Sequence, residues 1–192
     1  MDISADTIVA PATPDGFGGV SVIRLSGPNS IKIIKSISLL LNNKTPIYKP
    51  NCAVYVKILE KNGRTLDDGF ITFFKAPKSY TGENSYEISC HGNPSLVKKI
   101  INRCCNEGAR LASPGEFTRR AFLNGKIDLL QAEAVSNLIY SKSVKSASLN
   151  HKILHGGLSK KIREIREKLF SLLAKIEFEL DFSEEELQKN LR

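Results

Sequence analysis

The period of the hydrophobic pattern changes near residue 118. Before that point, several short runs alternate apolar with polar residues, which is the period of a half-buried strand. After it, apolar residues recur every three or four positions, which is the period of a helix. We therefore predict an α+β fold in two parts. Residues 1–118 form a mixed sheet-and-helix domain with about four to six strands, and residues 119–192 form part of an α-helical bundle.

The last predicted helix carries a long apolar stripe. Its members are Leu158, Ile162, Ile165, Leu169, Leu172, Ile176 and Leu180. A stripe at this spacing is normally buried against other helices, and the chain supplies few of them. We therefore expect the remainder of the bundle to lie beyond Arg192.

Turn residues divide the first part. Asn62-Gly63 predicts a tight hairpin after the strand 53–59. The return run contains Asp67-Asp68-Gly69, where we expect a bulge. A helix is predicted over residues 31–41, with Ile31, Ile34, Ile37 or Ser38, and Leu41 on its buried face.

Capping residues mark the later helices. Asn93-Pro94 begins a helix that ends before Gly108, and residues 116–124 form a shorter one. Asp128 with Gln131 has the spacing of a capping box, and Gly156-Gly157 separates the last two helices.

The charge balance favours an anionic partner. The formal net charge is +8, which suits nucleic acid or a polycarboxylate ligand. Basic residues are in excess between residues 98 and 126 and again between residues 142 and 168. The two interpretations are ordinary solvated helix faces or a surface that contacts RNA. The basic residues of the first range are Lys98, Lys99, Arg103, Arg110, Arg119, Arg120 and Lys126.

The remaining composition indicates a cytoplasmic protein with no membrane span and no metal site. No apolar run approaches the roughly 20 residues that cross a bilayer, and MDISADTIVA lacks the basic start of a secretory signal. The four cysteines form no Cys-x-x-Cys pair, so we expect them to be reduced.

Two charged residues lie inside predicted strands. Arg24 shares a face with Val20 and Val22 in the strand 19–26, where a charge is costly unless it is paired. It is either a solvent-facing arginine or an anchor for a carboxylate or polar heterocycle. Glu87 lies in a strand that leads to His91, and it either forms a structural salt bridge or accepts hydrogen bonds from ring N–H donors such as those of a pterin.

Four stretches together resemble the MnmE/TrmE family of tRNA-modification GTPases. They are DTIVAPATPDGFGGVSVIRLSGPNS, SYTGENSYEISCHGN, SPGEFTRRAFLNGKIDLLQAEAVSNLI and FELDFSEEE. The third is the most specific, and together they span nearly the whole chain. One departure is Asn93, where the family usually has a second glycine after His-Gly. The family's G domain and its Cys-Ile-Gly-Lys ending are not among these residues.

The resemblance implies a tetrahydrofolate-binding domain similar to that of aminomethyltransferases, followed by the start of the helical domain. It implies a homodimer formed through the first domain and a site for 5-formyl-tetrahydrofolate near the dimer interface. Arg24 of VIRLSG, Glu87 of YEISCHG and Lys126 of LNGKIDL match the family's ligand contacts. The full protein would act with the flavoprotein MnmG (GidA) on the wobble uridine of certain tRNAs, adding a 5-carboxymethylaminomethyl-type group. Its GTPase domain would use GTP, Mg²⁺ and K⁺.

Two other functions remain open from the sequence. One is a stand-alone folate-dependent aminomethyl transferase, which would need a complete second domain after residue 118. The other is a non-enzymatic RNA-binding adaptor that uses the basic surface. A Walker-type phosphate loop after Arg192 would decide for the GTPase over both.

We predict that this chain alone does not hydrolyse GTP. No Gly-x-x-x-x-Gly-Lys-Ser/Thr occurs in it, and Gly125-Lys126 is followed by Ile127. Without that loop and its magnesium ligands, the transferred phosphoryl group cannot be positioned. The purified chain should release no phosphate from GTP with Mg²⁺ and K⁺ present, and potassium-dependent hydrolysis would contradict the prediction.

Overall fold

The computed structural model describes the backbone of residues 6–189 and the side chains of residues 6–180. The chain divides into two compact units between Ile127 and Asp128. The predicted boundary near residue 118 falls inside a helix of the first unit. Each unit is described by itself below.

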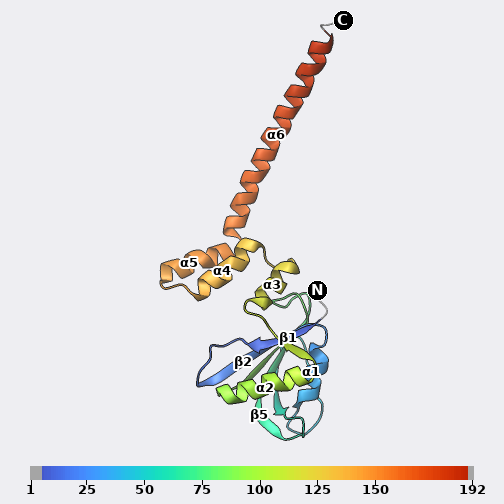
Figure 1. Cartoon of the computed structure of the whole chain (residues 1–192), viewed down its shortest axis with the longest axis vertical. Helices are drawn as coiled ribbons and strands as arrows, with labels where there is room; N and C mark the ends of the chain where they lie inside the picture. Colours follow the sequence, from blue (N-terminus) through green and yellow to red (C-terminus); the bar gives the residue numbers. More distant parts are fainter. Residues whose placement is uncertain (1–5, 190–192) are drawn as a thin grey trace. The chain divides into compact units, whose positions relative to one another are not determined.

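The first unit is built on a seven-stranded sheet with the strand order β3-β4-β5-β6-β2-β1-β7 (Figure 1). Neighbouring strands are antiparallel, except that β1 and β7 are parallel. The α+β prediction is therefore confirmed, although the sheet has seven strands where about four to six were expected. The strands are β1 (Thr7–Pro11), β2 (Gly18–Ser26), β3 (Ser38–Leu39), β4 (Ala53–Leu59), β5 (Thr65–Phe74), β6 (Ser85–Gly92) and β7 (Ala109–Leu111).

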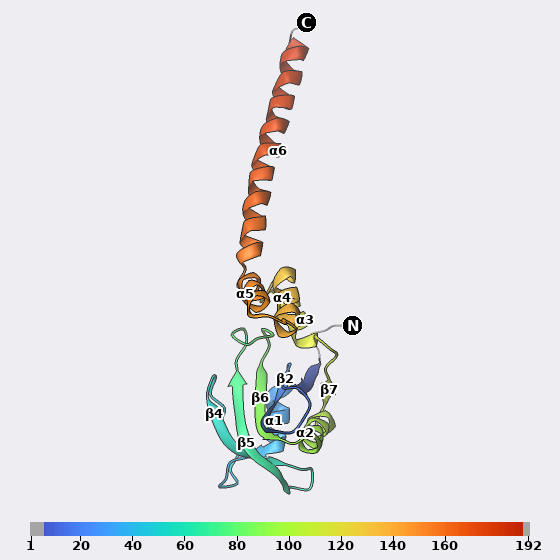
Figure 2. The same ribbon diagram turned by 90° about the vertical axis from the view of Figure 1, so that its left-hand side faces the viewer.

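Two helices cover one face of the sheet (Figure 2). They are α1 (Ser30–Ile37) and α2 (Pro94–Asn106). Their apolar residues join one cluster with alternate strand residues, because successive side chains of a strand point to opposite faces. The fully buried members of this cluster are Val9, Ile23, Leu25, Ile33, Ile34, Ile37, Val56, Ile58, Ile71, Tyr86, Ile88, Ile100 and Cys104.

The opposite side of the sheet, here called the open face, carries the alternate residues. Two of its rows follow from the register: Tyr55, Phe70, Ser89 and Val22 in one, and Thr72, Glu87 and Arg24 in the next. Tyr55 is 44% exposed and Phe70 49% exposed, and their rings contact each other with centroids 5.0 Å apart. The predicted faces of the strands 19–26 and 86–91 are thus confirmed.

The helix predicted over residues 31–41 is wrong at its C-terminal end. It ends at Ile37, and Ile31 and Leu41 are exposed instead of buried. Ser38 adopts an extended conformation and pairs with Ile58 of β4. Its hydroxyl donates to the carbonyl of Ile34 at 2.5 Å and lies 2.8 Å from the hydroxyl of Tyr48. This tertiary contact holds Ser38 outside the helix.

The hairpin at Asn62-Gly63 is confirmed, with Gly63 at a φ of +80°. The bulge expected at Asp67-Asp68-Gly69 is wrong, because β5 runs through these residues in continuous register. The register shift lies one residue earlier on β5: Ile58 pairs with Asp67 and Leu59 with Thr65, so Leu66 is the extra, unpaired residue. Gly69 is required for a different reason: a Cβ atom there would lie 2.1 Å from the carbonyl oxygen of Ser89 on β6.

The helix predicted over residues 116–124 is present as α3 (Glu116–Leu123), with Asn124 as its C-cap. The second unit contains α4 (Leu129–Ile139), α5 (Val144–Leu154) and α6 (Gly157–Lys189). The capping box before α4 is confirmed in both directions, since the Gln131 N–H donates to Asp128 and the Asp128 N–H donates to Gln131, each at 2.9 Å.

The apolar stripe of α6 faces solvent in this chain. Its exposed fraction ranges from 38% at Leu158 to 62% at Leu169. An apolar stripe this exposed marks a surface that another chain segment or another protein covers.

We predict that Gly69→Ala destabilises the first unit by about 1–3 kcal/mol or more, because the added methyl group overlaps the backbone of β6. The matched control is Gly19→Ala, where a Cβ atom meets nothing within 4 Å. Urea unfolding followed by tyrosine fluorescence measures both, since four of the five tyrosines lie in the first unit. Equal midpoints for the two variants would contradict the prediction.

Candidate functional site

Arg24 and Glu87 form an ion pair on the open face. They lie directly opposite each other on the neighbouring strands β2 and β6. The Arg24 Nε and Nη2 atoms donate to the same carboxylate oxygen, Oε1 of Glu87, at 3.0 and 2.8 Å. Their side chains are 28% and 29% exposed. Each side chain therefore compensates the charge of the other within the sheet.

Two aromatic rings lie against this ion pair. The Arg24 guanidinium carbon is 5.2 Å from the ring centroid of Tyr80 and 5.7 Å from that of Phe117. A guanidinium at this distance is attracted to the face of an aromatic ring. The Tyr80 hydroxyl lies 2.8 Å from the hydroxyl of Thr118. The segment before β6 and helix α3 therefore meet over Arg24.

Lys126, which follows α3 in the chain, contacts the same segment before β6. Its ammonium group donates to the carbonyl of Pro77 at 2.7 Å, and its stem packs close to Gly82. Among the described residues it makes no hydrogen bond or ion pair with Arg24 or Glu87. The structure thus joins Arg24 and Glu87 directly and places Lys126 on the segment that carries Tyr80.

A buried ion network holds these segments in place. Arg120 of α3 is 1% exposed and contacts three carboxylates: Asp6 at 2.5 Å, Glu116 at 3.1 Å and Glu83 at 3.2 Å. Arg110 joins the network through Glu116 and Asp6, each at 2.7 Å. The network therefore ties α3 and the segment before β6 to the start of β1.

Hydrogen bonds from the arginines favour the ionised forms of Glu116 and Asp6. The hydrogen bond from Arg110 is the largest influence on Glu116 and lowers the pKa of its carboxyl to about 2. The same arginine is the main cause of the lowered pKa of Asp6. Glu116 is nearly inaccessible at 2% exposure, so its charge depends on these partners for compensation.

Comparison with known proteins accounts for both units. Residues 7–126 match the family model described as the GTP-binding protein TrmE N-terminus, and residues 129–192 match the model of the MnmE helical domain. The chain belongs to the MnmE/TrmE family.

Its curated relatives carry the name tRNA modification GTPase MnmE. The chain is 47% identical to the Cytophaga hutchinsonii protein over 183 residues, 47% identical to the Thermotoga petrophila protein over 180 residues, and 45% identical to the Legionella pneumophila protein over 185 residues. These alignments cover 94% to 96% of the chain but only 39% to 40% of each relative. The chain thus spans about two fifths of the length of these MnmE proteins.

The basic residues between positions 98 and 126 do not form one continuous positively charged surface that could contact RNA. Arg120 is buried, Arg110 is ion-paired, and Arg103 is 9% exposed and paired with Glu107. Lys98 and Lys99 remain exposed on α2. The spacing of four between Glu116 and Arg120 is the sequence signal for this ion pair on a helix.

Other residues that could have formed a functional site have structural partners or form no cluster. His91 pairs with Asp67 through its Nδ1 atom at 2.7 Å, and its side chain is 72% exposed. The described part of the chain contains no cluster of three potential metal ligands, and no helix in it is both long and apolar enough to cross a membrane. Tyr80 and Phe117 carried no sequence signal that distinguished them from core residues.

We predict that Glu116→Gln destabilises the first unit by about 3 kcal/mol at neutral pH, because it leaves two arginines short of one charge in a buried network. The lowered pKa of Glu116 also means that its stabilisation is complete above its ordinary pKa of 4.5 and is lost as the pH falls toward 2.

Urea midpoints measured between pH 7 and pH 2 test both statements. The wild type should lose more stability than Glu116→Gln between pH 4.5 and 2. The control is Glu133→Gln, an exposed glutamate on α4. Parallel curves for the wild type and Glu116→Gln would contradict the prediction.

Proposed function

We propose that the Arg24–Glu87 site binds the pterin ring of a reduced folate, 5-formyl-tetrahydrofolate or a close relative. The observation that carries the proposal is a half-exposed carboxylate that an arginine orients beside two aromatic rings. A pterin is flat and presents an amino group and ring N–H donors along one edge. It needs a carboxylate acceptor in its plane and apolar or aromatic surface against its faces.

The hydrogen bonds within the described residues leave half of the Glu87 carboxylate available. Both bonds from Arg24 end on Oε1, so Oε2 is free to accept from a ligand. The two donors from Arg24 also fix the plane of the carboxylate before a ligand arrives. A prealigned acceptor binds more tightly because less conformational freedom is lost on binding.

In this proposal, Lys126 binds the glutamate tail of the folate. Arg24 is paired with Glu87, whereas Lys126 is exposed and, within the described residues, its ammonium group donates to the carbonyl of Pro77 alone. Because its side chain is flexible, the Lys126 ammonium group can give up its hydrogen bond to the neutral carbonyl and bind the carboxylate of the glutamate tail instead. The chain contributes binding and orientation, and we assign no catalytic residue to it.

The full-length protein is proposed to be a cytoplasmic tRNA modification GTPase, as its relatives are named. In this proposal it forms a homodimer through the first unit and acts with MnmG (GidA) on the wobble uridine. GTP, Mg²⁺ and K⁺ bind outside this chain. Exposed apolar residues, with Val20 at 65% and Phe70 at 49%, support the dimer because isolated monomers rarely leave such residues on one sheet face.

We predict that Glu87→Gln weakens 5-formyl-tetrahydrofolate binding about 10- to 100-fold, since a lost hydrogen bond to a charged group costs roughly 1.5–3 kcal/mol. Calorimetric titration of the ligand into the wild type and the variant measures this. Glu164→Gln, an exposed glutamate on α6, is the matched control and should bind as the wild type does.

Circular dichroism and sedimentation should accompany the titration, because Glu87→Gln also weakens the contact with Arg24. Equal affinity of the wild type and Glu87→Gln would remove Glu87 from the site. Failure of a folded wild-type dimer to bind would remove the folate assignment from this chain.

A further inference from the structure

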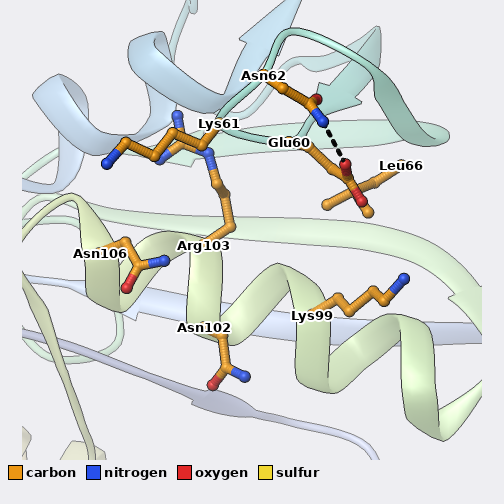
Figure 3. A pocket seen from close by; sticks show the side chains of 8 residues that line it. All are labelled: Glu60, Lys61, Asn62, Leu66, Lys99, Asn102, Arg103 and Asn106. Carbon is orange, nitrogen blue, oxygen red and sulfur yellow. Dashed lines mark hydrogen bonds between the residues drawn. The ribbon is translucent and has the colours of Figure 1, made fainter.

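A polar groove lies on the first unit between α2 and the hairpin that joins β4 to β5 (Figure 3). We call it the α2 groove, and its volume is about 480 Å³. The hairpin contributes Glu60, Lys61, Asn62 and Leu66. None of these residues belongs to the proposed folate site.

The helix contributes the other wall. Lys99, Asn102, Arg103 and Asn106 line it, and their spacing of three, one and three places them on one side of α2. Lys99, Asn102 and Asn106 are exposed, so their polar groups are available to a partner.

Arg103 anchors this wall. Only 9% of it is exposed, and its guanidinium forms an ion pair with Glu107 and donates to the carbonyl of Ser36 at 3.4 Å. Its charge is therefore largely compensated. Lys61 and Lys99 add two positive charges to the groove. The carboxylate of Glu60 accepts from the neutral amide of Asn62 at 3.1 Å and keeps its negative charge, so the groove remains positive by one charge.

The two lysines are arranged for an extended partner. Figure 3 shows the ammonium groups of Lys61 and Lys99 on opposite sides of the groove, directed away from each other. A single small anion would be held by groups that converge. Divergent cations with amide groups between them suit a chain of repeated negative charges, whose phosphates meet the cations and whose hydroxyl groups meet the amides.

We propose that the α2 groove binds the phosphodiester backbone of an RNA, namely a tRNA. The proposal rests on the proposed function only in taking tRNA as the substrate of the full-length protein. The formal net charge of +8 supports it, because such an excess attracts polyanions and speeds their association. Arg110 and Arg120, which the sequence grouped with Lys99, face carboxylates and cannot serve this role.

The test is the binding of an unmodified tRNA transcript to the complete chain, followed by fluorescence anisotropy at several salt concentrations. The double variant Lys61→Gln with Lys99→Gln should bind roughly 5- to 10-fold more weakly for each lost phosphate contact near 0.1 M salt. The slope of log affinity against log salt should fall in magnitude by about 1.4–1.8. The matched control is Lys44→Gln with Lys49→Gln, two exposed lysines in the same unit but outside the groove.

Wild-type affinity and slope in the groove variant would overturn the proposal, as would equal losses in the groove and control variants. Absence of tRNA binding by the wild type at low salt would overturn it too. Calorimetry with 5-formyl-tetrahydrofolate separates the two assignments, since the groove variant should bind folate as the wild type does. A wild type that binds tRNA through the groove but no folate would contradict only the folate site.

Discussion

The first unit depends on the burial of one arginine. Arg120 brings a full charge into the protein at 1% exposure, and it is tolerated there because Asp6, Glu83 and Glu116 surround it. These carboxylates come from the chain start, the segment before β6 and α3. Their mutual attraction to one guanidinium therefore decides where the two segments that carry Tyr80 and Phe117 must lie. The network therefore favours the placement of the two aromatic rings beside Arg24 on the open face.

The site combines rigid and adaptable parts. Arg24 and Glu87 project from neighbouring strands in fixed register, so the position of the carboxylate is set by the sheet. Lys126 lies outside the sheet and holds a neutral carbonyl with an exposed side chain. Such a division suits a ligand with a flat ring at one end and a flexible, charged tail at the other.

Local pattern predicted the strands β2, β4, β5 and β6, most helix caps and the faces of Arg24 and Glu87, because these depend on period and on neighbouring residues. It did not predict β1 or β3. It did not predict that the two residues touch, since strand pairing joins positions 63 residues apart. The end of α1 was missed because Tyr48 fixes Ser38 through a tertiary contact. Neither interpretation of the basic run, solvated helix faces or an RNA surface, predicts the burial of Arg120, because two of its three partners are distant in sequence.

Helix α6 can act as a lever. It contains 33 residues, which at 1.5 Å per residue gives a rod about 50 Å long. It begins directly after Gly156, whose φ of +79° is a conformation that other residues rarely adopt. A rotation of about 5° at that glycine would swing the far end of such a rod by about 4 Å. A small local change at the α5–α6 junction is thus converted into a displacement comparable to the spacing of neighbouring strands.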